Sequence, residues 1–136
     1  MKNSKTGTVL IYNCRGAKFA KLPQILAMLR IRMRRVEPNQ YNLSLLELAQ
    51  GEGVPMENPG EPIAEDMLVF CGLNQAFLNQ LLEVIRLGKF PPILKAMLTE
   101  DNKGWNSVQL RDELLEEKKK IEKDDLMTDT TMERVE

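Results

Sequence analysis

The chain has 136 residues, of which 43% are hydrophobic and 29% are charged, which is the composition of one modest globular domain. It contains no histidine, so the sequence excludes catalytic triads of the Ser-His and Cys-His types and lacks the commonest metal ligand. The formal net charge of −1 conceals an asymmetry, because residues 1–50 carry a net of +7 and residues 51–136 a net of −8.

The sequence also bears on location and cofactors. No apolar run approaches the roughly 20 residues that a membrane-spanning helix needs, and the first residues lack the apolar region of a signal peptide. We therefore expect a cytoplasmic protein whose two cysteines are reduced thiols. The cysteines do not have CxxC spacing, so we expect no zinc site and no cofactor.

The first third of the chain predicts a strand, a helix and a second strand. Residues 8–14 are rich in β-branched and aromatic side chains, which favour a strand. A helical stripe follows, made of Leu22, Ile25, Leu26, Leu29 and Met33. The chain then has to turn near Ile31 into a second strand that ends at Val36, although no glycine marks the turn.

The next stretch predicts a short helix and a connection. Asn42 is a candidate N-cap for a helix over residues 43–50, and Gly51 follows that helix. Residues 51–62 hold three glycines and three prolines and predict an irregular connection.

The centre of the chain predicts a second unit of the same kind. Residues 67–73 are apolar without interruption, which is typical of a strand buried on both faces. Asn74 is a candidate N-cap for the helix that follows, and Gly88 is expected to end that helix in a left-handed conformation. Residues 93–98 then predict the fourth strand.

The C-terminal part predicts one more helix. Asn106 is a candidate N-cap with Gln109 at the capping-box position, and the apolar period continues to Ile121. We therefore predict a single α/β domain over residues 1–121 and a charged, frayed tail over residues 122–136.

The two strand-helix-strand units resemble each other, since Leu-Ile-Tyr-Asn-Cys-Arg-Gly in the first corresponds to Leu-Val-Phe-Cys-Gly in the second. We predict an α/β (α+β) fold in which two β-α-β units form a four-stranded, ferredoxin-like sheet with helices on one face and an extra C-terminal helix. The first and third strands would be central, adjacent and parallel, so Cys14 and Cys71 would lie near one another at the same end of the sheet. A doubly wound parallel sheet is the alternative.

Two groups of residues are candidates for chemical sites. The arginines at 30, 32, 34 and 35 could grip phosphates, but charged side chains that protect an edge strand are the favoured interpretation. Nucleic-acid binding is not expected, because only Tyr12 and Phe70 could form an aromatic platform and the second half of the chain is acidic. Both cysteines are interpreted as core residues, more firmly for Cys71 than for Cys14, which has Arg15 beside it.

The segment from residue 94 to residue 105 points to a family. Its pattern has Lys-Ala on a strand, then Thr, then Asn-x-x-Trp before an acidic helix, and it matches Lys95, Ala96, Thr99, Asn102 and Trp105. The chain therefore resembles a small bacterial family known as domain of unknown function thirty-seven eighty-three, well over residues 67–118 and more loosely in the first third. The resemblance implies no activity.

Two functional hypotheses follow. The favoured one is a non-catalytic binding or regulatory module, and a candidate for self-association into a homo-oligomer through a sheet face or edge. The alternative is a small enzyme or ligand sensor with a polar site around Lys95, Thr99 and Asn102, since ligands gather at strand ends in open α/β folds. For the segment from Thr99 to Asn106 we predict a structural role, in which Trp105 covers the start of the last helix and docks it against the sheet.

Overall fold

The computed structural model describes the backbone of residues 7–135 and the side chains of residues 7–121. Within this part the fold is mixed α+β. The strands are β1 (Thr8–Tyr12), β2 (Arg32–Arg35), β3 (Met67–Cys71) and β4 (Leu94–Met97). The α-helices are α1 (Lys21–Met28), α2 (Leu45–Gln50), α3 (Gln75–Leu87) and α4 (Ser107–Val135), and short 3-10 helices cover Ala17–Phe19 and Pro38–Gln40.

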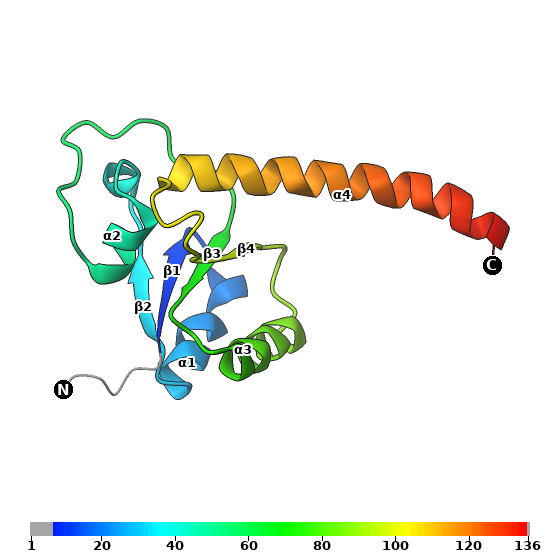
Figure 1. Ribbon diagram of the computed structural model, residues 1–136. Coiled ribbons are helices and arrows are strands. Elements are labelled where there is room, and N and C mark those ends of the chain that lie inside the picture. The colour runs from blue at the N-terminus through cyan, green and yellow to red at the C-terminus, as the bar shows by residue number, and fades with distance from the viewer. Residues whose placement is uncertain (1–6, 136) are drawn as a thin grey trace.

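The four strands form one mixed sheet in the order β2-β1-β3-β4 (Figure 1). The prediction that the first and third strands are central and the second and fourth are at the edges is confirmed. However, β1 and β3 are antiparallel, while each pairs in parallel with its own edge strand. The ferredoxin-like arrangement is therefore not confirmed, and the alternative of a wholly parallel sheet is wrong.

The antiparallel central pair also overturns the prediction for the cysteines. Cys71 lies opposite Thr8 at the start of β1, whereas Cys14 follows the end of β1, where Tyr12 lies opposite Met67. The two thiols are thus at opposite ends of the sheet, and they pack in cores on opposite faces.

The connection between the two units explains this orientation. It leaves the sheet after β2 and returns beside the end of β1, so it stays at one end of the sheet. The Nδ2 of Asn13 donates to the carbonyls of Ile63 and Glu65, both at 2.7 Å, and the Cys14 backbone N–H donates to the Asp66 carboxylate at 2.9 Å. These contacts hold the start of β3 against the end of β1, which requires the two strands to run in opposite directions.

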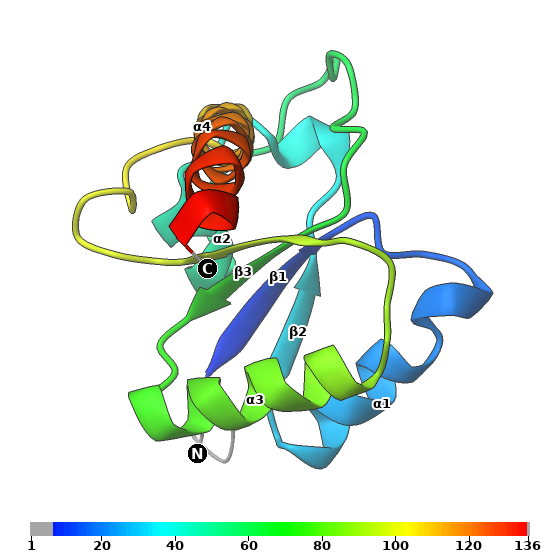
Figure 2. The ribbon, with the colours of Figure 1, turned by 90° about the vertical axis from the view of Figure 1, so that its right-hand side faces the viewer.

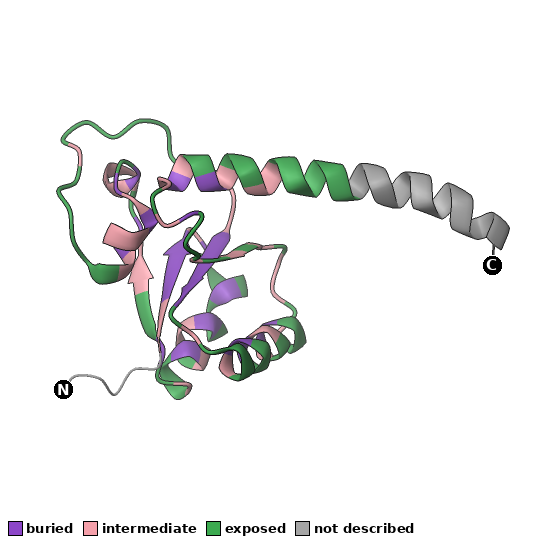
Figure 3. Ribbon diagram, viewed as in Figure 1, coloured by how far each residue is buried: buried purple, intermediate pink, exposed green. Residues whose placement is uncertain are grey.

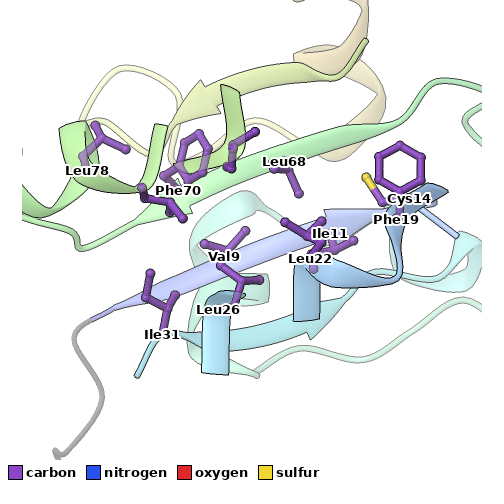
Figure 4. Close-up of a cluster of buried hydrophobic side chains, with 12 residues drawn as sticks. Val9, Ile11, Cys14, Phe19, Leu22, Leu26, Ile31, Leu68, Phe70 and Leu78 are labelled. Carbon is purple, nitrogen blue, oxygen red and sulfur yellow. The ribbon is translucent and has the colours of Figure 1, made fainter. Parts of the chain in front are cut away.

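Helices cover both faces of the sheet, not one face as predicted (Figures 2 and 3). On one face α1 and α3 pack on side chains of the central strands that include Val9, Ile11, Leu68 and Phe70 (Figure 4). On the other face α2 and the start of α4 pack on the alternate residues, among them Leu10 and Val69. All five residues of β3 are buried, as the unbroken apolar run predicted.

The predicted caps are mostly confirmed. Asn74 accepts a hydrogen bond from Phe77 N–H at 2.7 Å, and Asn106 and Gln109 form the reciprocal capping box with distances of 2.8 and 2.9 Å. The short helix is capped by Ser44 instead of Asn42.

Two other details differ from the predictions. Met33 belongs to β2 and not to the first helix. Gly88 has ordinary right-handed angles, and the left-handed residue after α3 is Lys89, at φ 55°. Arg30, at φ 60°, plays the same part after α1, which explains how the chain turns there without a glycine.

The last helix is attached to the sheet at its first turn. Ser107 is fully buried, and its hydroxyl lies 2.6 Å from the hydroxyl of Tyr12 on β1. Leu110 and Leu114 continue the contact with the core on that face. The side chains of residues 122–136 lie outside the described residues, so the frayed tail stays a prediction. Among the described residues, no helix is long and apolar enough to cross a membrane.

The bond between Tyr12 and Ser107 gives a test of how α4 is held. Tyr12→Phe leaves the buried Ser107 hydroxyl without its partner, and we expect it to lower the free energy of unfolding by about 1–2 kcal/mol in urea denaturation. Ser107→Ala should cost a similar amount. Because both changes remove one bond, the double variant should lose less than the sum of the two, and strict additivity would contradict the assignment.

Candidate functional site

The turn after β4 contains two of the predicted site residues, and their polar groups bond to each other and to the local backbone. The Asn102 side-chain oxygen accepts from Thr99 N–H at 2.8 Å, and Thr99 Oγ1 accepts from Asn102 N–H at 3.2 Å. The Asn102 Nδ2 donates to the Met97 carbonyl at 2.9 Å. Asn102 is only 9% exposed, so its amide is engaged within the turn.

The rest of this segment joins the turn to α2 and α4. The Trp105 N–H donates to the Asn102 carbonyl at 2.9 Å, and the Trp105 carbonyl accepts from Leu45 N–H at 2.8 Å. Trp105 is half-buried and packs against the core that α2 and α4 share. Ser44 and Asn106 form an isolated antiparallel bridge beside it. These contacts are compatible with the docking role, which stays a prediction.

Lys95 lies apart from this turn. It is paired with Leu68 in the ladder and therefore stands on the face of the sheet that α3 covers. Its Nζ donates to the Ile93 carbonyl at 3.2 Å, and the two cavities that it lines are not lined by Thr99, Asn102 or Trp105. The structure thus brings Thr99 and Asn102 together and leaves Lys95 separate. The site hypothesis for these residues stays a prediction.

The side chains of Lys95 and Asn102 both bond to backbone carbonyls at the free edge of β4. Leu94 and Leu98 donate their N–H groups to carbonyls next to and within β3, so the alternate residues Ile93, Lys95 and Met97 point their backbone groups away from the sheet. The Lys95 ammonium covers the Ile93 carbonyl, and the Asn102 amide covers the Met97 carbonyl. Side chains therefore occupy two of the acceptors that this edge would offer to another strand.

The opposite edge, at β2, is arranged differently. Arg32 and Val36 donate their N–H groups at 2.8 and 2.9 Å to carbonyls on the β1 side, so the backbone groups of Met33 and Arg35 point outward. Among residues 7–135, β1 is the only strand that pairs with β2, and no backbone group bonds to its outward side. Met33 is 38% exposed. This edge therefore offers free donors and acceptors to an added strand.

Arg34 lies in a cavity at this edge. The cavity has a volume of about 340 Å³ and is lined by β2, by the C-terminal end of α2 and by the loop that follows. The Nε of Arg34 is buried and has no hydrogen-bond partner among the described residues. Gly51, at φ 72°, lets the chain pass the guanidinium, because a Cβ there would lie 2.8 Å from Nη1.

The electrostatic environment of this cavity is set by the end of α2 and by the arginines near it. The guanidinium of Arg34 lies at the C-terminal end of α2, where the helix dipole favours a cation. Of the nearby arginines, Arg35 donates to the Asn13 carbonyl at 2.7 Å and Arg15 pairs with Glu37 at 3.2 Å. Within the described side chains, Arg32 and Arg34 make no ion pair with a carboxylate.

The cysteines are core residues in this structure. Both are free and buried. Burial and the nearby Asp66 carboxylate raise the pKa of Cys14 to about 11, and burial raises the pKa of Cys71 to about 12. Both thiols are therefore protonated and unreactive near neutral pH. Among the described residues there is no group of three or more Cys, Asp or Glu side chains that could hold a metal ion.

One comparison with known proteins gives a match. Residues 66–121 match the family model described as "Domain of unknown function (DUF3783)", which supports the resemblance noted in the sequence. The matched segment contains Lys95, Thr99, Asn102 and Trp105 but not β2. No curated protein and no solved structure matches the chain. The family description names no activity, so similarity assigns none to this chain.

The sequence predicts an edge role for the arginine cluster, but it contains no signal for the cavity around Arg34. That cavity exists because the end of α2 folds back over β2. Gly51 marks the end of a helix in the sequence, but no local pattern shows which strand that helix end will face.

The Asn102 bonds predict a loss of stability. Asn102→Ala removes both side-chain hydrogen bonds and leaves the Met97 carbonyl and the Thr99 N–H without these partners, so we expect it to lower the free energy of unfolding by about 2 kcal/mol. Lys95→Ala is the control and should cost less than about 0.5 kcal/mol, since its ammonium is exposed. Urea denaturation of both variants measures this. Equal losses would contradict the structural role of Asn102.

The raised pKa of Cys14 predicts a pH dependence. The unfolded thiol ionises near its ordinary pKa of 9.0 and the native thiol near 11, so the stabilising contribution is complete below pH 9 and is lost as the pH rises from about 9 to about 11. Cys14→Ala should flatten the fall in the free energy of unfolding over this range, while Cys71 keeps its own contribution. Parallel profiles for wild type and variant would show that Cys14 is not shifted.

Proposed function

We propose that the chain is a non-catalytic binding module that accepts an extended segment of another protein on the open edge of β2. The observation that carries this proposal is the outward direction of the backbone groups of Met33 and Arg35, which have no partner among residues 7–135. Strand addition to a free sheet edge is a recurrent mode of peptide recognition, in which main-chain hydrogen bonds supply affinity and side-chain pockets supply specificity. The cavity beside Arg34 is such a pocket.

A partner other than a second copy of the chain fits this edge better. If two copies paired through β2, arginines would face arginines across the interface, which is unfavourable in a sheet. Pairing of β2 with β4 of another copy is disfavoured because Lys95 and Asn102 occupy two outward carbonyls of β4. Self-association into a homo-oligomer is therefore the less favoured form of this proposal.

Binding of nucleic acid through the sheet is not part of the proposal. A base-binding platform needs exposed aromatic residues on the central strands. Tyr12 and Phe70 are 0% and 4% exposed, since helices cover both faces. The two free thiols agree with a reducing compartment, and we include a cytoplasmic location in the proposal.

Proline substitution gives a direct test of the edge. In Met33→Pro the missing N–H is an outward one, so the ladder with β1 keeps its bonds while the edge loses a donor. The probes are two short synthetic peptides in which valine alternates with glutamate or with glutamine. We expect that a peptide that binds the wild type slows hydrogen exchange at the Met33 and Arg35 amides, as measured by NMR, and that it binds Met33→Pro at least about tenfold more weakly.

The matched control is Lys95→Pro, which makes the same change at the corresponding position of the other edge strand. This variant should bind the peptides as the wild type does. If neither peptide protects the two β2 amides, or if Lys95→Pro loses binding and Met33→Pro does not, the proposal is wrong. Loss of binding in Lys95→Ala alone would favour the alternative site around Lys95, Thr99 and Asn102.

A further inference from the structure

The chemistry of β2 points to one class of partner. We infer that the bound segment is one in which acidic and apolar residues alternate, with a carboxylate of its acidic face entering the cavity beside Arg34. This inference rests on the proposed function and specifies its ligand.

The two faces of β2 carry different side chains, and an added strand would contact both sets. Arg32 and Arg34 pair with Thr8 and Leu10 and so stand on the face that α2 covers. Met33 pairs with Val9 and stands on the opposite face, together with Arg35, whose guanidinium donates to the Asn13 carbonyl. Side chains directly opposite each other on neighbouring strands interact. A strand with acids on the α2 face and an apolar residue opposite Met33 thus complements the two arginines on one face and the Met33 side chain on the other.

The cavity supplies the strongest position for a carboxylate. Its guanidinium lies close to the backbone at Gly51 and has no carboxylate partner among the described side chains. The Nε is already shielded from water without a hydrogen bond, so a carboxylate that accepts from the Nε–H would satisfy a buried donor. Arginine and carboxylate bind each other in a planar, two-bond geometry.

One acidic residue also lines the cavity. Glu52 follows Gly51 and is exposed. Its charge opposes an incoming carboxylate and limits the affinity. We therefore expect Glu52→Gln to strengthen binding of an acidic segment, whereas a cavity that served only to hold Arg34 in place would show no such effect on a ligand.

A nucleic acid is the competing ligand for a row of arginines. It would use the charges of Arg32 and Arg34 but could not bond to the outward main-chain groups of Met33 and Arg35 as a strand does. The main-chain groups and the apolar side chain of Met33 therefore favour a peptide. The two ligands differ in the test, because phosphate binding falls steeply with salt and would not protect the Met33 and Arg35 amides in a strand pattern.

The experiment is a double-mutant cycle between protein and peptide, followed by fluorescence anisotropy on the full chain. The wild type should bind the glutamate peptide about tenfold more tightly than the glutamine peptide, as expected for one charge-assisted contact. Arg34→Gln should weaken binding of the glutamate peptide by about the same factor and leave binding of the glutamine peptide unchanged. Arg86→Gln on α3, away from this edge, is the control for the change in net charge and should bind as the wild type does.

The outcomes separate this inference from the proposed function. If both peptides bind equally and protect the β2 amides, the edge binds strands but the acidic preference is wrong. If Arg34→Gln weakens both peptides equally, the cavity does not recognise the carboxylate. If a single-stranded oligonucleotide displaces the glutamate peptide at low concentration and binds without amide protection, the edge is a phosphate site and the inference fails.

Discussion

The antiparallel pairing of β1 with β3 is the constraint on which the rest of the structure depends. Five residue pairs, from Thr8 with Cys71 to Tyr12 with Met67, join the two strands. Apart from Thr8 all of these residues are buried, so this pair contributes side chains to both cores. Since buried apolar area is the main source of folding free energy, a shift of one residue in this register would exchange the two faces and disrupt both cores.

This pairing also relates the two halves of the molecule. A twofold axis normal to the sheet, between Leu10 and Val69, would superimpose β1 on β3 and β2 on β4, and it leaves α1 and α3 on the same face. The likeness of the two units in the sequence is thus a likeness in space. The symmetry is broken by the additions to each half: the connection with α2 lies over β2, and the turn at Asn102 lies beside β4.

The features of this fold that were predicted correctly depend on residues that are close together in the sequence. Asn74 and Asn106 cap helices through residues only three positions ahead, and the apolar run of residues 67–71 is buried because every side chain in it is apolar. The relative direction of the two units was not predicted, because it depends on contacts such as that between Cys14 and Asp66 across a long connection. The place of Arg34 depends likewise on where the end of α2 comes to lie. For the same reason Lys95, Thr99 and Asn102 were predicted as one site from their closeness in the sequence, although Lys95 stands on the face of the sheet that α3 covers and bonds apart from the turn.

Helices cover both faces of the central strands, so among the described residues the outward backbone groups of the sheet lie at its edges. The side chains of the central strands pack in the two cores, and their backbone groups bond to the neighbouring strands. What remains is the outward side of β2 and of β4, and these have different chemistry. At β4 a lysine and an asparagine bond to two of the outward carbonyls, so side chains occupy part of this edge. At β2 the charges do not cover the backbone. In the proposed complex the arginines of β2 disfavour apolar and basic strands, against which they would stay unpaired, and they favour an acidic strand.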